Sequence, residues 1–547
     1  MPATFTSGSP FGRASRLLAR AAPASLALVL TACGGGGAGG DDAPIVPPSS
    51  ALSCTLIPGR VDPSPPVDDP LLPEQWHLHN TGQCGGIAGE DLRAFAAWNR
   101  SRGIDALGAP TQVAVVDDAL ELGHEDLAPN VATGRSHDYL TGGDAPEPRA
   151  SSDDHGTRVA GIIAARDDNG RGVAGVAPRA ALLGLNALAT NTTADLADAM
   201  TRGFDLTAIY NNSWGAPDDG FLNRVDPIWA AAIERGLERG RGGRGSIYVM
   251  PGGNGRTVSV LDAGGSPVGS TVDNSNFDGY ASQRGVIAVC SVDRFGRRPS
   301  YGEAGANLLV CAPSSDATVG IRTTNIANSY DSGFSGGSAS TPMVSGVVAL
   351  MLAANPALSW RDVRLVLARS ARRNDPTDPS WDLAGPYPYS EVYGFGMVDA
   401  AAAVDLAAGW ASVGGSDQLL RCGPYRRAPA LALPDASADG ATVVPVTDRI
   451  EVTGCGIGRI EWIELRFSAT DHSYGGDLRL RLFAPDGLRS DLAHARSCGG
   501  RIPASLDPCR STYDDWPFGS VRFMDRPAAG TWQLEATDMQ PGDVGSL

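Results

Sequence analysis

The sequence predicts an α/β domain followed by an all-β domain, and two patterns lead to this fold class. From about residue 70 to 410, short apolar runs alternate with amphipathic stretches. This alternation is typical of βαβ units, which build a mostly parallel sheet with helices on both faces. After Gly414, apolar and polar residues alternate one by one, as in WIELRF (462–467) and DLRLRLF (477–483). That period predicts a β-sandwich.

Six apolar runs predict the strands of the parallel sheet. They are QVAVVDD (112–118), ALLGLNAL (181–188), AIYNNSW (208–214), GSIYVMPGGN (245–254), GVIAVCSV (285–292) and NLLVCAPSS (307–315). Amphipathic stretches between them, such as TRVAGIIAAR (157–166) and DPIWAAAIERGLERG (226–240), predict helices. Ligand sites in such folds lie at the carboxyl ends of the strands.

The N-terminus has the features of an export signal. Arg13, Arg16 and Arg20 precede an apolar stretch that is too short to span a bilayer. It ends in LTAC, which resembles the lipobox of bacterial lipoproteins, where the cysteine, here Cys33, is diacylated after cleavage. The alternative is simple cleavage and free secretion. We expect a signal peptide over 1–32, a disordered tether over 33–68, an α/β domain over 69–414 and a sandwich over 415–547.

Charge and cysteine content narrow the function classes. The formal net charge of −17 argues against nucleic acid or an anionic membrane surface as partner and permits attraction to cationic substrates. Eight of the nine cysteines remain after Cys33, and export favours disulfides. The shortest pairings are Cys54 with Cys84, Cys290 with Cys311, Cys422 with Cys455, and Cys498 with Cys509. Eight cysteines allow about 105 connectivities, so other pairings stay open.

Ser338 is a candidate nucleophile because of where it lies. In FSGGSASTPMVSGVVALML (334–352), small residues precede Pro342 and an apolar helical pattern. This places Ser338 at a helix N-terminus, where free N–H groups and the helix dipole favour negative charge. Taken alone, the serine could equally be an ordinary N-cap.

Three other stretches supply the groups that a serine nucleophile needs. Asp117 ends a buried strand, His155 precedes a helix, and Asn254 follows another strand in a glycine turn. Each also has a plain structural explanation, as a helix cap, a loop residue or a turn residue. The order Asp, His, Ser within one α/β segment is that of subtilisin, which favours the catalytic interpretation.

On these residues the chain resembles the subtilisin-like serine proteases, and within them the kexin and furin group. The supporting stretches include DDHGTRVAG, NNSWGAPDDG, GGNG, NFDGY and SGGSASTP, and the sandwich resembles the P domain of that group through YGGDLRLRLFAPDG and GTWQLEA. The resemblance covers about residues 69–547. It implies that Ser338 attacks the peptide carbonyl, that His155 transfers the proton, that Asp117 orients His155, and that Asn254 binds the oxyanion.

The resemblance also implies a preference for basic substrates. Asp218 and Asp278 match carboxylates of the primary specificity pocket, Asp118 matches one that faces the next residue upstream, and Ser213, Trp214 and Gly215 belong to the same substrate-binding stretch. Leu196 and Arg224 stand where furin is acidic, so we expect no requirement for a third basic residue.

Calcium is the cofactor that the resemblance implies, since oxygen clusters suit this ion. One site would use Asp69, Asp126 and Asn169 with the carbonyl groups of Arg166, Arg171 and Val173. A second would use Asp218, Asp273 and Glu303. Ordinary acidic surface loops remain the alternative.

Three departures from the family pattern qualify these expectations. Gly337 stands before Ser338 where the family usually has Thr, which predicts an active but slower enzyme. The segment between Cys33 and Asp69 is too short and polar for a folded prodomain, so a separate chaperone would assist folding or none is needed. The sequence ends at DVGSL, where P domains usually continue with another strand, so the piece is truncated or that sheet edge is open.

The sequence therefore predicts an exported, calcium-dependent serine endopeptidase that cleaves after basic residues, with a preference for paired basic residues. We expect a monomer, either anchored as a bacterial outer-membrane lipoprotein or secreted. The alternatives are a subtilisin-like protease of broad or apolar specificity, a hydrolase that acts on esters only, and a catalytically silent surface binding protein.

Overall fold

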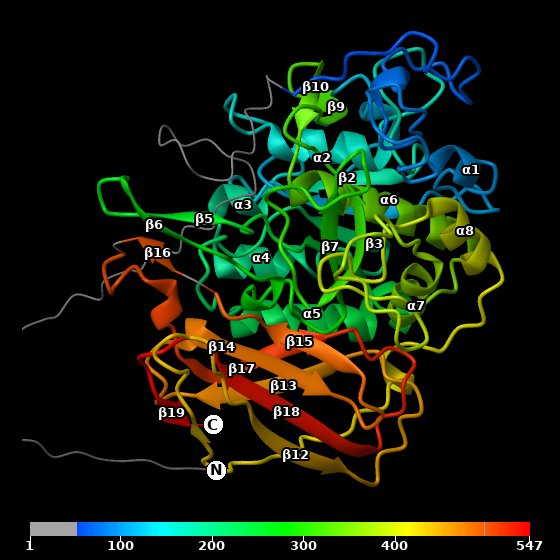
Figure 1. Ribbon diagram of the computed structural model, residues 1–547. Helices are drawn as coiled ribbons and strands as arrows, with labels where there is room; N and C mark the ends of the chain where they lie inside the picture. The colour runs from blue at the N-terminus through cyan, green and yellow to red at the C-terminus, as the bar shows by residue number, and fades with distance from the viewer. Residues whose placement is uncertain (1–51, 497, 501, 547) are drawn as a thin grey trace, which may run out of the picture.

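The computed structural model describes residues 52–496, 498–500 and 502–546. The predicted signal peptide and Cys33 lie outside the described residues. The fold class is confirmed: an α/β domain with a parallel sheet is followed by an antiparallel β-sandwich, drawn in the lower part of Figure 1.

The central sheet has six strands in the order β2-β1-β3-β4-β7-β8, and all neighbouring pairs are parallel. Its strands are β1 (Gln112–Val116), β2 (Ala181–Leu185), β3 (Thr207–Asn212), β4 (Ile247–Pro251), β7 (Val286–Val292) and β8 (Leu308–Pro313). Five of them lie inside one of the predicted apolar runs, and β3 begins one residue before its run. Nearly every residue of these strands is buried, because helices cover both faces.

Helices on both sides of the sheet make the domain three-layered, with α2 and α8 on one side and α5 on the other in Figure 1. The helices are α1 (Ala94–Trp98), α2 (His155–Ala164), α3 (Ala187–Thr190), α4 (Thr193–Ala199), α5 (Pro227–Arg239), α6 (Gly337–Ala354), α7 (Trp360–Ser370) and α8 (Ala400–Ala408). Among the described helices, only α6 is long and apolar enough to cross a membrane, yet 94% of its apolar window is buried in the core. It is therefore a core helix.

Two hairpins extend from the α/β domain. The β5 (Val258–Leu261) and β6 (Pro267–Thr271) hairpin follows β4 and projects to the left in Figure 1. The β9 (Ile321–Asn325) and β10 (Ser329–Phe334) hairpin leads directly into α6. Short 3-10 helices are η2 (Leu72–Glu74), η3 (Ala128–Asn130), η4 (Gly240–Gly243), η5 (Ser275–Phe277), η6 (Ser416–Gln418), η7 (Gly475–Asp477) and η8 (Pro508–Arg510).

The sandwich packs a sheet of order β12-β18-β14-β15 against the β13-β17 pair. Its strands are β11 (Ala432–Leu433), β12 (Val446–Val452), β13 (Ile463–Ala469), β14 (Leu478–Phe483), β15 (Arg489–Ala493), β16 (Gly499–Gly500), β17 (Tyr513–Ser520), β18 (Gly530–Asp538) and β19 (Gly545–Ser546). On β14, buried leucines alternate with half-buried residues, as the sequence pattern predicts.

The two halves are tightly joined. The side chain of Asn276 exchanges two hydrogen bonds with the Gly519 backbone, and Arg369 pairs with Asp525 at 2.6 Å. Phe277 and Ala306, from the α/β half, belong to the core of the sandwich. The β16 strand also pairs with β6 across the boundary. The β-sandwich is therefore packed directly against the α/β domain, with buried residues and hydrogen bonds across the interface.

The four shortest cysteine pairings are confirmed. The disulfides are Cys54–Cys84, Cys290–Cys311, Cys422–Cys455 and Cys498–Cys509. The first of them changes the interpretation of the predicted tether. Residues 52–68, its last part, are folded against the α/β domain, since Leu52 and Val67 are buried and Cys54 is fixed to Cys84. The domain boundaries themselves remain predictions.

Candidate active site

An aspartate and a histidine meet at the carboxyl edge of the central sheet. Asp117 directly follows β1, and His155 is the first residue of α2. The Nδ1 of His155 lies 2.8 Å from Oδ1 of Asp117, and both side chains are almost fully buried. Gly156 allows this approach, because a Cβ there would lie 2.1 Å from the Ala119 carbonyl oxygen. A buried carboxylate with an imidazole partner can hold the ring in one tautomer.

The surroundings of His155 favour its charged form. Burial lowers the pKa of His155, but the charge and the hydrogen bond of Asp117 outweigh this effect and raise it to about 9. The neighbouring Asp118 accepts hydrogen bonds from the His155 and Gly156 backbone N–H groups, at 3.1 and 2.8 Å. Burial and the charge of Asp117 raise the pKa of Asp118 to about 7. Through its two hydrogen bonds to backbone N–H groups, Asp118 fixes the first turn of α2.

Sequence reasoning did not include Phe334 among the residues around the histidine. Its ring packs against that of His155 with 5.4 Å between centroids, and it is buried. Phe334 ends β10 and stands four residues before Ser338. An apolar residue just ahead of the SGGS stretch is the only sequence signal for this contact.

Ser338 is the second residue of α6 and is buried. Its Oγ donates a hydrogen bond to the Ser213 carbonyl oxygen at 3.2 Å, and the Ser213 Oγ donates to the Ser338 carbonyl oxygen at 3.2 Å. The Nε2 of His155 is buried and has no hydrogen-bond partner within the described ranges. Since α2 packs against α6, the serine and the histidine begin two adjacent helices at one edge of the sheet.

Asn254 lies beside the N-terminus of α6. Its Oδ1 accepts a hydrogen bond from the Gly337 N–H at 2.8 Å, and its own backbone N–H donates to Asp218 at 3.1 Å. The first contact fixes the amide plane and leaves Nδ2 as the donor end. A Cβ at position 337 would lie 2.6 Å from the Cβ of Pro251. The absence of a side chain at Gly337 therefore relieves crowding against β4.

Asp278 lies under the stretch that the sequence assigns to substrate binding. Its carboxylate accepts hydrogen bonds from the N–H groups of Ala216 and Tyr280, at 3.1 and 2.6 Å. A Cβ on Gly215 would lie 2.5 Å from Oδ2 of Asp278, so the backbone passes directly over the acid. Burial raises the pKa of Asp278 to about 6. Ser213 and Trp214 continue this stretch, and the Trp214 indole is anchored on the Val116 carbonyl oxygen.

Asp218, Asp273 and Glu303 form a buried carboxylate cluster, the acidic cluster below. All three lie around Gly255, where a Cβ would meet Glu303 at 2.8 Å, Asp273 at 2.7 Å and Asp218 at 3.1 Å. Burial, reinforced by the other acids, raises the pKa values of Asp273 and Glu303 well above their usual range. Within the described residues, no arginine or histidine forms an ion pair with any of the three.

The other predicted oxygen set is partly assembled. Asp126 accepts hydrogen bonds from the Asn169 amide at 2.7 Å and from the Val173 N–H at 2.8 Å. Asp69 is buried, and its Oδ1 has no hydrogen-bond partner in the described part of the chain. Burial raises the pKa of Asp69 to about 7, with further contributions from Asp126 and Asp167. The backbone N–H of Arg166 donates to the Asp126 carbonyl oxygen, and that of Arg171 to Asn169.

The donor atoms of both sets, the one around Asp69 and Asp126 and the acidic cluster, are of the kind that calcium binds. Calcium takes carboxylate and amide oxygens, and a buried carboxylate without a cation partner is costly. The orphaned Oδ1 of Asp69 and the unpaired acidic cluster are the observations that support this fit.

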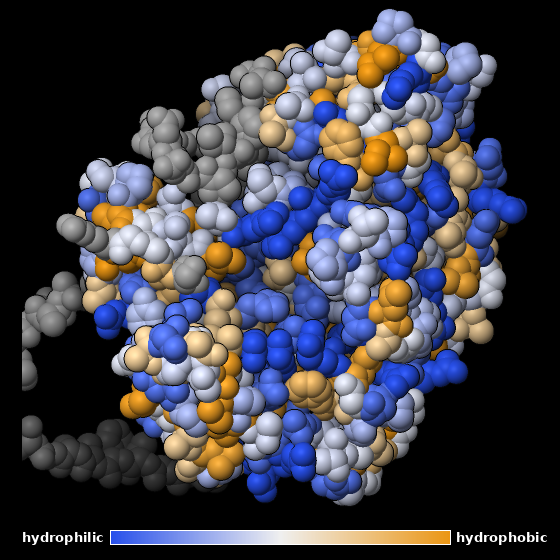
Figure 2. All heavy atoms as spheres, viewed as in Figure 1, coloured by the Kyte–Doolittle hydropathy of each residue, from blue (hydrophilic) through white to orange (hydrophobic). Residues whose placement is uncertain are grey.

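Leu196 and Arg224, which stand where furin has acidic residues, both pack against other parts of the protein. Leu196 is buried in α4, and Arg224 stacks over Trp516 of the sandwich at 5.2 Å. Neither side chain supplies negative charge. Figure 2 shows hydrophilic side chains gathered in the middle of one face, between the α/β half and the sandwich.

The chain belongs to the subtilase family, which its residues 108–396 match. Residues 460–547 match the proprotein convertase P-domain. With these two parts, it is homologous to kexins and proprotein convertases.

Particular relatives agree with this assignment. Neuroendocrine convertase 2 of Drosophila melanogaster is 33% identical over 88% of this chain and 71% of its own length. Protease KEX1 of Kluyveromyces lactis is 31% identical over 88% of this chain, which spans 59% of that relative. Among solved structures, a serine protease of Aeromonas sobria aligns with TM-score 0.74 and 26% identity, covering 90% of this chain and 97% of the other.

Proposed function

We propose that this protein is a serine endopeptidase that hydrolyses peptide bonds after basic residues, with a preference for paired basic residues. The observation that carries the proposal is the buried Asp117–His155 hydrogen bond, formed at the sheet edge where Ser338 begins α6. The kexin and convertase relatives support the same class of reaction.

In the proposed mechanism, Ser338 Oγ attacks the substrate carbonyl carbon. In its neutral form, His155 takes the hydroxyl proton at Nε2 and later donates it to the leaving amine, while Asp117 holds the ring through Nδ1. Asn254 Nδ2 and the Ser338 N–H bind the oxyanion, helped by the N-terminal end of the α6 dipole. Water then hydrolyses the acyl-enzyme. The serine hydroxyl first turns from the Ser213 carbonyl oxygen toward His155.

The basic preference follows from charge beneath the substrate stretch. Asp278 lies directly under Gly215, and Asp218 of the acidic cluster is close enough to interact with it. A guanidinium group forms strong, often bidentate hydrogen bonds with such a carboxylate. Asp118 lies beside the catalytic pair and would face the preceding basic residue. Leu196 and Arg224 offer no third acid.

The experiment uses fluorogenic peptides that end in Arg-Arg, Lys-Arg or Leu before the reporter. The purified protein is expected to cleave the first two much faster, and Ser338→Ala is expected to abolish the activity. Equal cleavage after Leu would indicate a protease of broad specificity. No cleavage of any peptide or ester would instead support a silent binding protein.

We also propose two structural calcium sites. Asp69, Asp126 and Asn169 would hold one ion, with the carbonyl groups of Arg166, Arg171 and Val173, and the acidic cluster would hold the other. Calcium would neutralise buried carboxylates and stabilise the loops that carry the pocket. Differential scanning calorimetry of Ser338→Ala with and without a chelator tests this, since it requires no activity.

Export is a further part of the proposal. The four disulfides favour an oxidising compartment outside the cytosol. A bacterial origin and a lipid anchor at Cys33 remain predictions from the LTAC stretch. Mass spectrometry of the membrane-bound protein would detect diacylation there.

A separate folding chaperone is proposed as the partner. One solved structure is that of the Aeromonas sobria serine protease in complex with a chaperone, and it aligns with TM-score 0.72 and 27% identity. Refolding yield of the purified chain with and without its neighbouring gene products would test for such a helper.

A further inference from the structure

The segment that joins the two halves carries a dibasic sequence. The chain contains no lysine, so its dibasic sites are its Arg-Arg pairs, at 297–298, 372–373 and 426–427. A protease that cuts after paired basic residues will meet these sites in other copies of itself. Which pair can be cut depends on exposure and backbone hydrogen bonding, because a protease binds its substrate as an extended, locally unfolded segment.

The first two pairs are protected. Arg297 accepts a backbone hydrogen bond from Asp293 at 2.8 Å, and Pro299 follows the pair. Arg372 forms two backbone hydrogen bonds with Met397, each of 2.9 Å, and its side chain pairs with Glu90 at 3.0 Å. Both pairs are therefore held in folded structure.

The third pair, Arg426 and Arg427, is exposed and is not held by backbone hydrogen bonds to described residues. Residues 421–428 are all exposed, and among the described residues no backbone–backbone hydrogen bond involves 421–431. The segment borders a cleft of about 1580 Å³ between the two halves, so little packs beneath it. The Arg427 side chain is 53% exposed, and its one ion pair with a described residue is that with Asp448, at 3.1 Å. Surface pairs of this kind are weak.

We infer that Arg427–Ala428 is a self-processing site, cut by a second copy of this chain. This inference rests on the proposed function. Water adds across the bond between the Arg427 carbonyl carbon and the Ala428 nitrogen. The products are a carboxylate at Arg427 and a free amine at Ala428.

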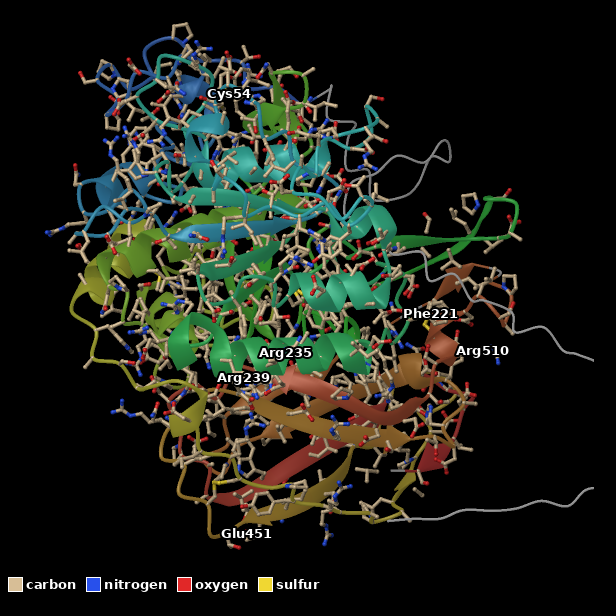
Figure 3. The ribbon with its side chains drawn as sticks, turned by 180° about the vertical axis from the view of Figure 1, so that it is seen from behind. Cys54, Phe221, Arg235, Arg239, Glu451 and Arg510 are labelled. Atoms are coloured by element: carbon tan, nitrogen blue, oxygen red, sulfur yellow. A yellow bond between two sulfur atoms is a disulfide. The ribbon has the colours of Figure 1, made fainter. Side chains whose placement is uncertain are left out.

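The cut must be intermolecular, because the segment lies far from the catalytic edge. Tyr425 and Arg427 contact Thr453 and Asp448, in or next to β12. Figure 3 shows Glu451 of β12 and Cys54 at opposite ends of the molecule. The Cys54 end is the one near the active site, since Leu52 is bonded to Ser332 of β10.

A disulfide gives this cut a distinctive product. Cys422 precedes the bond and Cys455 follows it, and the two are joined. The processed protein therefore stays in one piece as two disulfide-linked chains, and the buried interface between its halves is unchanged. Cleavage would free the segment over the cleft without releasing the sandwich.

The test uses full-length Ser338→Ala as the substrate and a trace of wild-type protein as the enzyme. We expect two bands on a reducing gel, one band without reductant, and a new N-terminus that reads Ala-Pro-Ala-Leu. The substrate Ser338→Ala with Arg427→Gln should stay intact. Equal melting temperatures of the two substrates would show that the substitution leaves the fold unchanged.

A parallel assay with an Arg-Arg fluorogenic peptide separates the two possible failures. If the peptide is cleaved and the substrate chain stays whole, the self-processing site is wrong and the proposed function stands. If the peptide is not cleaved, both are wrong. A new N-terminus at Asn374, or cutting of the Arg427→Gln chain, would also overturn the inference.

Discussion

Two groups of buried carboxylates lie near the same edge of the central sheet, and they differ in what balances their charge. Asp117 has a partner within the chain, the imidazole of His155 at 2.8 Å. Asp218, Asp273 and Glu303 have backbone N–H donors but no ion-pair partner among the described residues. Burial without a counter-charge is costly.

The difference indicates two kinds of function. The first carboxylate can tune a proton-transfer group because the protein itself supplies the cation. The acidic cluster needs a cation from outside. We propose that this cation is calcium, and that Asp278 next to the cluster binds the guanidinium group of a substrate.

Asp117→Asn is expected to lower kcat by roughly 10⁴-fold, since the amide would favour the wrong tautomer of His155. Steady-state kinetics with an Arg-Arg peptide measures this. Asp154→Asn is the matched control, because this acid precedes His155 in the chain but pairs with Arg158. A similar loss in both variants would contradict a special role for Asp117.

The second prediction concerns pH and uses the inactive Ser338→Ala protein. The folded pKa of His155, about 9, exceeds its unfolded value of about 6.5. The stabilisation by the charged pair is therefore complete below pH 6.5 and is lost as pH rises through 9. It amounts to roughly 3 kcal/mol.

The melting temperature of Ser338→Ala should therefore fall between pH 6.5 and 9, and adding His155→Gln should flatten that fall. A parallel decline in both proteins would be inconsistent with the pair.

Sequence predicted much of this site, and the limits have a physical basis. Runs such as QVAVVDD fix a buried strand and the residue that ends it, so Asp117, His155 and Ser338 could be placed at element ends. Phe334 could not be found, because packing between β10 and α2 leaves no periodic signal. Likewise, a Pro- and Ser-rich stretch predicted a tether, yet the Cys54–Cys84 bond ties residues 52–68 to the domain.

Removal of calcium should destabilise the folded protein, because the carboxylates of the acidic cluster would lose their cation. At a calcium concentration 100 times Kd, one site contributes about 2.7 kcal/mol. For Ser338→Ala, a chelator should therefore lower the melting temperature by roughly 5–10 °C. Adding Asp273→Asn should remove part of this shift, while the remaining site still responds. A melting temperature that is the same with and without the chelator would show that neither oxygen set binds calcium.

The smallest expected effect is on specificity. Asp278→Asn removes the charge and keeps one of the two oxygens that accept backbone hydrogen bonds, so kcat/KM for an Arg-Arg peptide should fall roughly 30-fold, or about 2 kcal/mol. Cleavage after Leu should change little. Asp219→Asn serves as the neighbouring control. An unchanged preference for Arg would place the specificity elsewhere.

The central claim is that Ser338 is activated by His155 and Asp117 beside a pocket for a basic residue. Its most direct test is labelling with a diphenyl phosphonate built on an Arg-Arg peptide, followed by peptide mapping. The account predicts one adduct, on Ser338, formed much faster than with the Leu analogue and nearly absent in Asp117→Asn. An adduct on another residue, or equal labelling in that variant, would contradict it.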